Sequence, residues 1–357
     1  MPVYESWKSD TKETSMESVS IIGLDLAKRY FQAHGSDRSG QKLFSKKLAR
    51  GQVLDFFKKQ EPCVVAMEAC ASCHYWGREI GALGHEVRLI PAQYVKPFVK
   101  RGKNDAADAE AICEAAVRPN MRFVGVKSGE QHGQAMLFRA RDLLVHQRTA
   151  LINAIRGHFG EFGVIARQGE AGFGELKTVF EEGVLPANAR LPMQALLDEV
   201  AGLDERIEHL EKEMKIVSKS DPKIKALRTI PGVGPITALA VRSLGADAKT
   251  FASGRANTVI WAAWMGLVPR QNSSGGKEKL GRVTKKGNKT LRRLVMICAG
   301  SLVNAIARGQ LDGEAWIQKL MKAKPRMVVI TAVANKIARV LWALQVHGGV
   351  YKARTAA

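Results

Sequence analysis

The first third of the chain consists of short apolar runs separated by polar breaks. The runs that predict strands lie at residues 18–28, 30–36, 42–48, 62–69 and 85–90. Helical patterns lie at residues 72–84, 91–98 and 104–117. Strands that first follow one another and then alternate with helices are typical of an α/β domain with a mixed sheet. We expect this domain to end near Val126.

Beyond residue 128 the apolar positions recur at helical spacing. Long helical patterns cover 129–159 and 193–219, and a glycine-rich interval at 160–175 separates them. The second pattern places four apolar residues on one face, with charges between them: Leu196, Leu203, Ile207 and Leu210. This spacing predicts an antiparallel helical hairpin or coiled-coil face, or alternatively a helix packed on its own domain. Two further helices are predicted at 288–307 and 325–344.

These patterns predict an α/β domain followed by all-α regions. The segment SKSDPK, residues 218–223, is interpreted as a linker between the helical regions. The expected parts are a flexible N-terminal extension (1–17), the α/β domain (18–126), a helical hairpin or coiled coil (127–220), a basic helical domain (221–350) and a tail (351–357).

The charge balance indicates a polyanionic partner. The chain of 357 residues holds 55 Lys and Arg against 34 Asp and Glu, a formal net charge of +21. A membrane partner is not favoured, since Asn335, Lys336 and Arg339 interrupt the longest apolar pattern. The polar start of the chain does not resemble a secretory signal. Five scattered cysteines favour reduced thiols in a cytoplasm.

Four acids are out of place in the apolar α/β domain. Asp25 lies in the first strand, Glu68 ends a later strand, and Asp105 and Asp108 lie three residues apart at a helix start. Each has an ordinary explanation: Asn104 or Asp105 as a helix cap, Asp25 in a turn, Glu68 paired with Lys28. Taken together, they favour a site for Mg²⁺ or Mn²⁺, which prefer oxygen ligands and offset carboxylate repulsion.

The C-terminal region carries features suited to phosphate binding. In RTIPGVGPITA, Gly232 and Gly234 permit a tight turn before a helix, as in a helix-hairpin-helix. A serine doublet, Ser273 and Ser274, precedes a glycine-rich stretch with one acid. Its eight basic residues are our candidates for nucleic-acid contacts: Lys277, Lys279, Arg282, Lys285, Lys286, Lys289, Arg292 and Arg293.

Both sets of residues resemble one protein family. The motifs GLDLAK, MEAC and KNDAADAEAI, which carry the four acids, resemble the DEDD set of RuvC-like nuclease domains. More narrowly, they resemble the insertion-sequence transposases of the IS-one-ten group, also described as bridge-RNA-guided recombinases. The stretch GLVPRQNSSG, followed by KKGN and LRR, resembles the second characteristic domain of that family. The resemblance spans residues 18 to about 344.

The resemblance carries expectations about fold and chemistry. It implies an RNase-H-like N-terminal domain whose Asp25, Glu68, Asp105 and Asp108 hold Mg²⁺ or Mn²⁺. It implies a serine nucleophile, best matched by Ser274 with Ser273 as runner-up, that forms a 5′-phosphoserine link to DNA in a composite site. The implied partners are donor and target DNA, a structured non-coding RNA and further copies of the chain, as a dimer or a tetramer. The implied location is the prokaryotic cytoplasm, in association with the nucleoid.

Two other classes of protein fit part of this pattern. A RuvC-like, metal-dependent nuclease acting on Holliday junctions would use the four acids with water as nucleophile, and would not need Ser274. A non-catalytic nucleic-acid-binding protein would use the acids only for caps and ion pairs. The serine separates the first alternative from the transposase, and metal-dependent cleavage separates the second.

Overall fold

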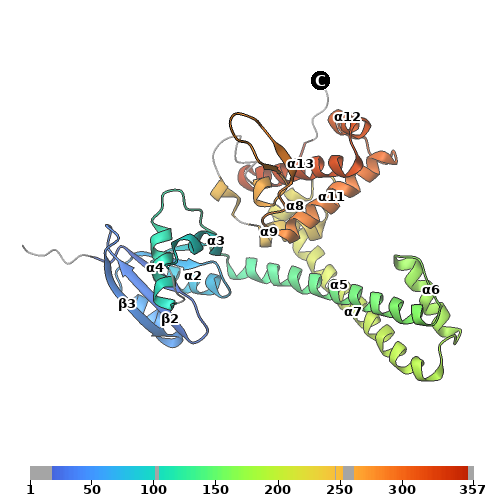
Figure 1. Cartoon of the computed structure of the whole chain (residues 1–357), viewed down its shortest axis with the longest axis horizontal. Helices are drawn as coiled ribbons and strands as arrows, with labels where there is room; N and C mark the ends of the chain where they lie inside the picture. Colours follow the sequence, from blue (N-terminus) through green and yellow to red (C-terminus); the bar gives the residue numbers. More distant parts are fainter. Residues whose placement is uncertain (1–17, 101–103, 246, 252–260, 353–357) are drawn as a thin grey trace, which may run out of the picture. The chain divides into compact units, whose positions relative to one another are not determined.

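The computed structural model describes residues 18–100, 104–245, 247–251 and 261–352 (Figure 1). The expected N-terminal extension, 1–17, and residues 353–357 of the expected tail lie outside the described residues. Contacts within the chain group it into two compact units, which meet between Ser128 and Gly129.

The first unit contains a five-stranded mixed sheet, as the strand pattern predicts. The strands are β1 (Ile21–Asp25), β2 (Tyr30–Ser36), β3 (Lys42–Ala49), β4 (Val64–Glu68) and β5 (Glu86–Ile90), in the spatial order β3-β2-β1-β4-β5. Strands β1, β2 and β3 pair antiparallel, whereas β4 is parallel to both β1 and β5. The central strand β1 therefore joins an antiparallel half to a parallel half.

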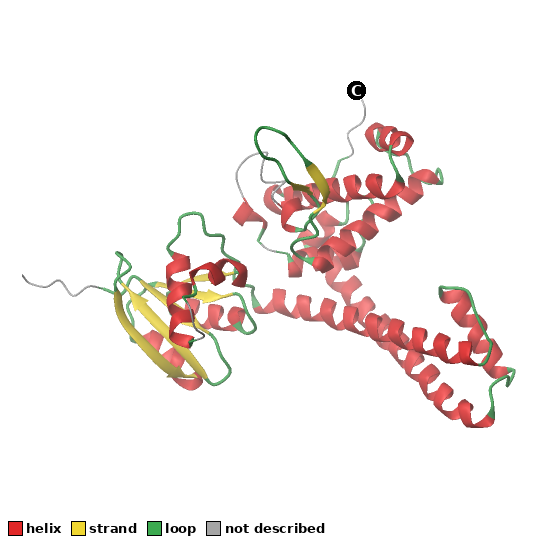
Figure 2. Ribbon diagram, viewed as in Figure 1, coloured by secondary structure: helices red, strands yellow, loops and turns green. Residues whose placement is uncertain are grey.

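Helices cover both faces of this sheet (Figure 2). They are α1 (Val53–Lys58), α2 (Cys73–Ala82), α3 (Ala92–Val95) and α4 (Asp105–Ala116), with short 3₁₀ turns at Arg50–Gln52 and Lys96–Phe98. Helices α1 and α2 pack on one face, and α3 and α4 on the other. Helix α1 was not predicted, because six residues are too few to establish a helical period.

Strand alternation on β1 decides which face carries Asp25. Ile22 and Leu24 are fully buried in the core beneath α1 and α2. Ile21, Gly23 and Asp25 lie on the opposite face, beneath α4. A Cβ atom on Gly23 would lie 2.2 Å from the carbonyl oxygen of Ala109, so only glycine lets α4 approach this closely. The approach brings the start of α4 toward the end of β1.

The second unit begins with a long helical hairpin. Helices α5 (Gly129–Glu161) and α7 (Ala187–Ser220) pack along one another, and α6 (Glu170–Glu181) lies near their far end (Figure 1). Four buried residues recur on α7 every seven positions, as in a coiled coil: Met193, Val200, Ile207 and Met214. On the predicted face, Leu203 and Ile207 are buried, whereas Leu196 and Leu210 are half-buried. Helix α6 begins inside the interval predicted to be a glycine-rich break.

The predicted linker at 218–223 is wrong. Helix α7 continues to Ser220, and α8 (Pro222–Leu227) starts two residues later. Asp221 separates them, and its Oδ1 caps α8 by accepting hydrogen bonds from the amides of Lys223 and Ile224, at 2.8 and 3.3 Å. A serine–aspartate–proline sequence is as typical of a helix start as of a linker, because proline fits the first helical position. The middle and C-terminal regions are therefore directly connected through helices.

The C-terminal part is a helical assembly with one small hairpin. Within the described residues its named elements are α8, α9 (Pro235–Leu244), a 3₁₀ turn at Ala248–Phe251, β6 (Pro269–Gln271), β7 (Leu280–Val283), α11 (Lys289–Ala307), α12 (Ala315–Ala323) and α13 (Arg326–His347), and residues 261–264 are also helical. Helices α11 and α13 are as predicted. They are long and apolar enough to cross a membrane by length and composition alone. Their buried faces, which include Val295 and Leu341, contribute to the core of this unit.

Candidate active site

Three of the four predicted acids lie together at one end of the sheet. Asp25 is the last residue of β1, and Asp105 and Asp108 lie in the first turn of α4. One carboxylate oxygen from each lies within 4.8 Å of the others. Burial, and then the negative charges of the other three acids, raise the pKa of Asp25 to about 6. At this distance the three negative charges repel one another, and a bound cation would relieve that repulsion.

Helix capping does not account for the aspartate pair. The cap is Asn104, whose Oδ1 accepts a hydrogen bond of 3.0 Å from the amide of Ala106. Asp105 and Asp108 follow it and are not needed for that role. The positive end of the α4 dipole favours negative charge in its first turn, which offsets part of their repulsion. Helix α4 therefore brings two carboxylates to the end of β1 without using either as a cap.

Glu68 lies beside this group but is not within it. Strands β1 and β4 run parallel with Leu24 opposite Met67, so Glu68 ends its strand next to Asp25. Its carboxylate contributes to the raised pKa of Asp25 but is not among the three that lie within 4.8 Å of one another. Among the described residues, no ion pair joins Glu68 to Lys28. Carboxylate oxygens are the donors that hard divalent cations prefer, so Asp25, Asp105 and Asp108 have the chemistry to hold one, and Glu68 lies beside them.

The serine doublet lies at the tip of the β6–β7 hairpin. Gly275 and Gly276 have φ values of +57° and +75°, which is the conformation of a two-residue type I′ turn. The amide of Lys277 closes this turn by donating to the carbonyl of Ser274 at 3.1 Å. The turn needs positive φ at both central positions, which glycine adopts without strain, so the SSGGK sequence favours reversal of the hairpin at this point.

The two serines differ in their hydrogen bonds. The hydroxyl of Ser273 accepts a bond of 3.1 Å from the amide of Lys279 on the opposite side of the hairpin. The hydroxyl of Ser274 has no hydrogen-bond partner within the described part of the chain. Both residues are exposed. Ser273 thus stabilises the hairpin, whereas Ser274 presents an uncommitted hydroxyl beside the turn.

The predicted basic residues fall into two groups. Six are exposed on the hairpin or directly after it: Lys277, Lys279, Arg282, Lys285, Lys286 and Lys289. Arg292 and Arg293 lie further along α11, which begins at Lys289, and both have protein partners. Arg292 donates to the carbonyls of Met265 and Lys286, at 3.0 and 3.2 Å, and Arg293 forms an ion pair with Asp142. These contacts give both arginines structural roles, in addition to any contact with phosphate.

The predicted turn with two glycines joins α8 to α9. Gly232 has φ of +82°, and a Cβ atom there would lie 2.7 Å from the carbonyl oxygen of Cys298 on α11. Gly232 therefore allows both the turn and its close contact with α11. Gly234 is the N-cap of α9 and, having no side chain, leaves the first amides of that helix without a side-chain cap. Phosphate binding at this turn stays a prediction.

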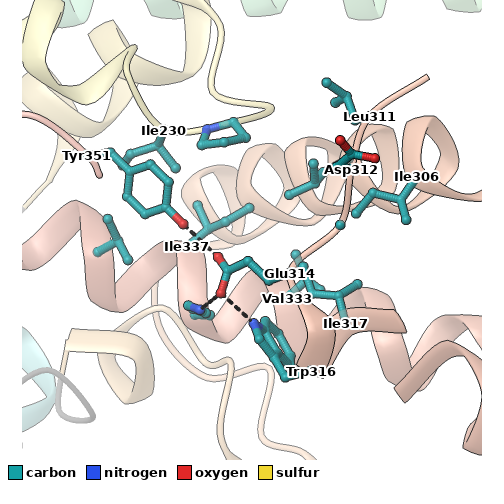
Figure 3. A pocket seen from close by; sticks show the side chains of 15 residues that line it. Ile230, Ile306, Leu311, Asp312, Glu314, Trp316, Ile317, Val333, Ile337 and Tyr351 are labelled. Atoms are coloured by element: carbon teal, nitrogen blue, oxygen red, sulfur yellow. Dashed lines mark hydrogen bonds and ion pairs between the residues drawn. The ribbon is translucent and has the colours of Figure 1, made fainter. Parts of the chain in front are cut away.

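Sequence patterns did not indicate a polar cluster beside this turn. A cavity of about 120 Å³ between the turn and helices α11–α13 is lined by Glu314, Trp316 and Tyr351 (Figure 3). The carboxylate of Glu314 accepts hydrogen bonds from Trp316 Nε1 at 2.8 Å, Tyr351 Oη at 2.7 Å and Lys336 Nζ. Burial opposes ionisation, but these bonds hold the pKa of Glu314 below its usual value.

Comparison with known proteins assigns the region of the acids and the region of the hairpin to transposase families. Residues 22–163, which include the acids, match a family model of DEDD transposases of the IS110 type. Residues 224–312, which include the hairpin, match the transposase IS116/IS110/IS902 family. The two matched regions therefore include both candidate sites.

Curated relatives extend the similarity to nearly the full length. A probable family 20 transposase of Pseudomonas aeruginosa is 48% identical over 92% of this chain and 97% of its own length. The transposase for insertion sequence element IS1328 of Yersinia enterocolitica is 39% identical, over 94% and 99%. The transposase for element IS1111A of Coxiella burnetii is 36% identical, over 96% and 93%. The chain therefore belongs to the IS116/IS110/IS902 family of transposases, enzymes that cut and rejoin DNA.

Proposed function

We propose that this transposase cuts and rejoins DNA through a phosphoserine intermediate formed by Ser274, with a divalent metal held by Asp25, Asp105, Asp108 and Glu68. The observation that carries the proposal is the close approach of three carboxylate oxygens, within 4.8 Å of one another. Such a group is unfavourable unless a proton or a cation is shared among its members. Because the chain belongs to a family of DEDD transposases, a bound metal ion explains this group better than a shared proton does.

The acids would hold Mg²⁺, or Mn²⁺ in its place, through oxygen ligands. When bound, the metal stabilises the negative charge that develops on the phosphate and on the leaving oxygen. The position of Asp25 is fixed, because it ends a central strand that has a neighbouring strand on each side. Asp105 and Asp108 are fixed by the first turn of α4. The protein's own part in the chemistry is to hold these carboxylates close together, although burial and the neighbouring acids raise the pKa of Asp25 to about 6 and so favour its protonated form when no metal is bound.

Ser274 would supply the nucleophile. Its Oγ forms a bond to phosphorus while the bond from phosphorus to the 3′ oxygen breaks. The hydroxyl loses a proton and the departing oxygen gains one, leaving a 5′-phosphoserine and a free 3′-hydroxyl. A 3′-hydroxyl of another strand reverses the step, because the phosphoserine diester retains the energy of the original bond. No external energy source is needed to rejoin the strands.

The exposed cations would hold the nucleic-acid partners. Six exposed basic residues on and beside the hairpin suit phosphate contacts with donor and target DNA and with a structured non-coding RNA. The long α5–α7 hairpin, with its heptad pattern, suits assembly of a dimer or a tetramer. The enzyme would then act at the DNA of a prokaryotic cytoplasm.

A metal-dependent nuclease with water as nucleophile is the second candidate. It is favoured by the carboxylate group alone, which has the ligands that such an enzyme requires. It predicts that Ser274 is dispensable and that no protein is left attached to the cut strand. The two functions therefore differ in one product, a covalent bond between protein and DNA.

The experiment that separates them is a denaturing gel of labelled DNA after cutting. Wild-type protein should give an adduct, attached at the 5′ side of the cut, that protease collapses. Ser274→Ala should lose the adduct and recombination but keep nucleic-acid binding, since one neutral hydrogen bond contributes only about 1 kcal/mol. Ser273→Ala is the matched control and should lose only its bond to the amide of Lys279. Cutting by Ser274→Ala without an adduct would support the nuclease instead.

A further inference from the structure

A groove runs between α13 and the β6–β7 hairpin, within the second unit. Its volume is about 1080 Å³. On the helix side it is lined by residues of one face of α13: Met327, Val328, Thr331, Asn335 and Arg339. On the hairpin side, Arg282 and Val283 line it. Asn335 Nδ2 donates to the carbonyl of Leu267 at the base of the hairpin, at 3.1 Å, and so holds the two walls together.

The groove combines exposed apolar surface with positively charged side chains. Met327 and Val328 are 62% and 50% exposed, which is unusual for neighbouring apolar residues on a helix of a folded core. The charged residues that line the groove are Arg282, Lys336 and Arg339, and none of its lining residues is acidic. The Nε atom of Arg339 is buried and has no hydrogen-bond partner among the described residues. A complementary ligand would be both anionic and apolar.

Trp316 forms an aromatic part of this groove and is held in place by the Glu314 cluster. Its Nε1 donates to Glu314, and Lys336 Nζ lies 4.8 Å from the centre of its ring (Figure 3). The same carboxylate binds Lys336 and Tyr351, so the indole is fixed before any ligand arrives. A fixed aromatic ring costs little conformational entropy when a ligand packs against it.

We infer that this groove binds a single-stranded segment of nucleic acid. Bases would pack against Trp316, Met327 and Val328, while phosphates would contact Arg282 and Arg339. In a duplex the bases are stacked inside the helix, so a duplex could bind the groove only through contacts between its phosphates and the basic side chains. The inference rests on the proposed function, which supplies the nucleic acid. Because the hairpin that forms one wall also carries Ser274, a strand in the groove would follow the element that bears the nucleophile.

The test compares two apolar residues of matched exposure, one inside the groove and one outside it. Met327→Glu places a negative charge in the groove, and Met136→Glu places the same charge on α5, where the methionine is 68% exposed. Both variants also carry Ser274→Ala, so that no strand is cut. The probe is a fluorescein-labelled single strand of about 12 nucleotides, within the usual range for one binding module, and binding is followed by anisotropy. The same sequence as a duplex is the second probe.

Met327→Glu should weaken single-strand binding about tenfold, equivalent to about 1.4 kcal/mol, and weaken duplex binding less. Met136→Glu should change neither by more than about twofold, less than half a kcal/mol. Val328→Glu should behave as Met327→Glu does, which guards against a defect peculiar to one substitution. Circular dichroism and thermal melts check that each variant is folded.

Equal binding by Met327→Glu, Val328→Glu and Met136→Glu would overturn the inference. A change in sedimentation behaviour with no change in strand binding would also overturn it, and would assign the groove to a second copy of the chain. Competition by an acidic peptide, but not by unlabelled single strands, would assign it to a protein partner. Failure of the proposed function appears differently: loss of the protein–DNA adduct in wild type leaves groove binding by the non-cutting variants unaffected.

Discussion

The carboxylate group and the serine hairpin differ in how firmly the fold holds them. Asp25 ends a central strand with paired neighbours on both sides, and the glycine two residues before it lets α4 pack directly on that strand. Ser274 lies at the tip of a two-stranded hairpin whose residues from 271 to 280 are all exposed. One set of groups is fixed by the core of a domain, and the other by a single turn and a few hydrogen bonds.

This difference shows what each region needs from its ligand. The carboxylates are already close, so in the proposed function a bound metal would have only to relieve their repulsion. The hydroxyl of Ser274 is exposed on a turn, so in the proposed function bound DNA would have to complete the geometry of attack. In the proposed function, a metal site fixed by the core and a nucleophile on an exposed hairpin would make cutting depend on correct binding of the strand.

The largest effect should come from removing a carboxylate. Asp25→Asn, Glu68→Gln and Asp108→Asn should each lower Mg²⁺-dependent strand cutting by about 10³-fold or more, since several kcal/mol of charge stabilisation depends on the metal. Asp55→Asn, which removes an exposed acid of the same unit, is the control. Strand cutting on a labelled substrate is the measurement. Full activity in Asp25→Asn would rule out the metal site.

A smaller effect should come from the exposed cations. With about six phosphates contacted, the slope of log affinity against log salt should be roughly −4 on single strands and roughly −5 on duplex. Lys285→Gln with Lys286→Gln should flatten the single-strand slope by about 1.4 and weaken binding about 25-fold at about 0.1 M salt. The control pair, Lys215→Gln with Lys219→Gln, removes the same amount of positive charge from α7. Equal slopes for the two pairs would move the binding surface away from the hairpin.

These two lysines test phosphate contacts more cleanly than the arginines of α11. Arg292 and Arg293 bond to main-chain carbonyls and to Asp142, so charge reversal there would disturb the fold as well as binding. Lys285 and Lys286 are exposed. Loss of affinity in the lysine pair, with an unchanged melting temperature, can be assigned to the nucleic-acid contact.

The pH dependence should report on Asp25. In the metal-free protein its pKa is raised to about 6, so below that pH a proton competes with the metal. Apparent Mg²⁺ affinity should fall about tenfold per pH unit below about pH 6 and be nearly flat above it. Calorimetric titration with Mg²⁺ between pH 5 and 8 measures this. A flat affinity across the whole range would contradict a metal site that includes Asp25.

The smallest effect should be a gain in stability. A raised pKa means that the folded protein binds the proton of Asp25 more tightly than the unfolded chain, whose value is near 3.8. The stability from this group is therefore complete below pH 3.8 and lost as pH rises through about 6. Asp25→Asn should raise the melting temperature of the metal-free protein by about 2–4 °C at neutral pH, and by much less near pH 4. A decrease at neutral pH would show that repulsion is not the dominant interaction.

The sequence predicted the parts of this molecule that follow from local patterns. The mixed sheet, the long helices α5, α7, α11 and α13, and the placement of Asp25 on the face opposite Leu24 all follow from periods of two or 3.6 residues. The three aspartates were recognisable because ionised groups are rare in apolar segments. Each of these signals is contained within a few neighbouring residues.

The features that were missed depend on contacts between distant segments or on very short elements. Helices α1 and α12 are too short for a clear period. The cluster of Glu314, Trp316 and Tyr351 joins a loop, a helix and the C-terminal segment, so no stretch of sequence contains it. The segment around Asp221 reads equally well as a linker and as a helix cap, and only the packing of α7 and α8 decides between them.

The most direct test is to locate the covalent bond and its dependence on metal in one experiment. Protein and DNA are incubated with Mg²⁺ or with a chelator, digested with protease and nuclease, and examined by mass spectrometry. We predict a nucleotide on the peptide at Ser274 when Mg²⁺ is present, and none with the chelator or in Asp25→Asn. A nucleotide on Ser273 would identify Ser273, and not Ser274, as the nucleophile. Cut DNA with no modified serine would contradict the account and assign the attack to water.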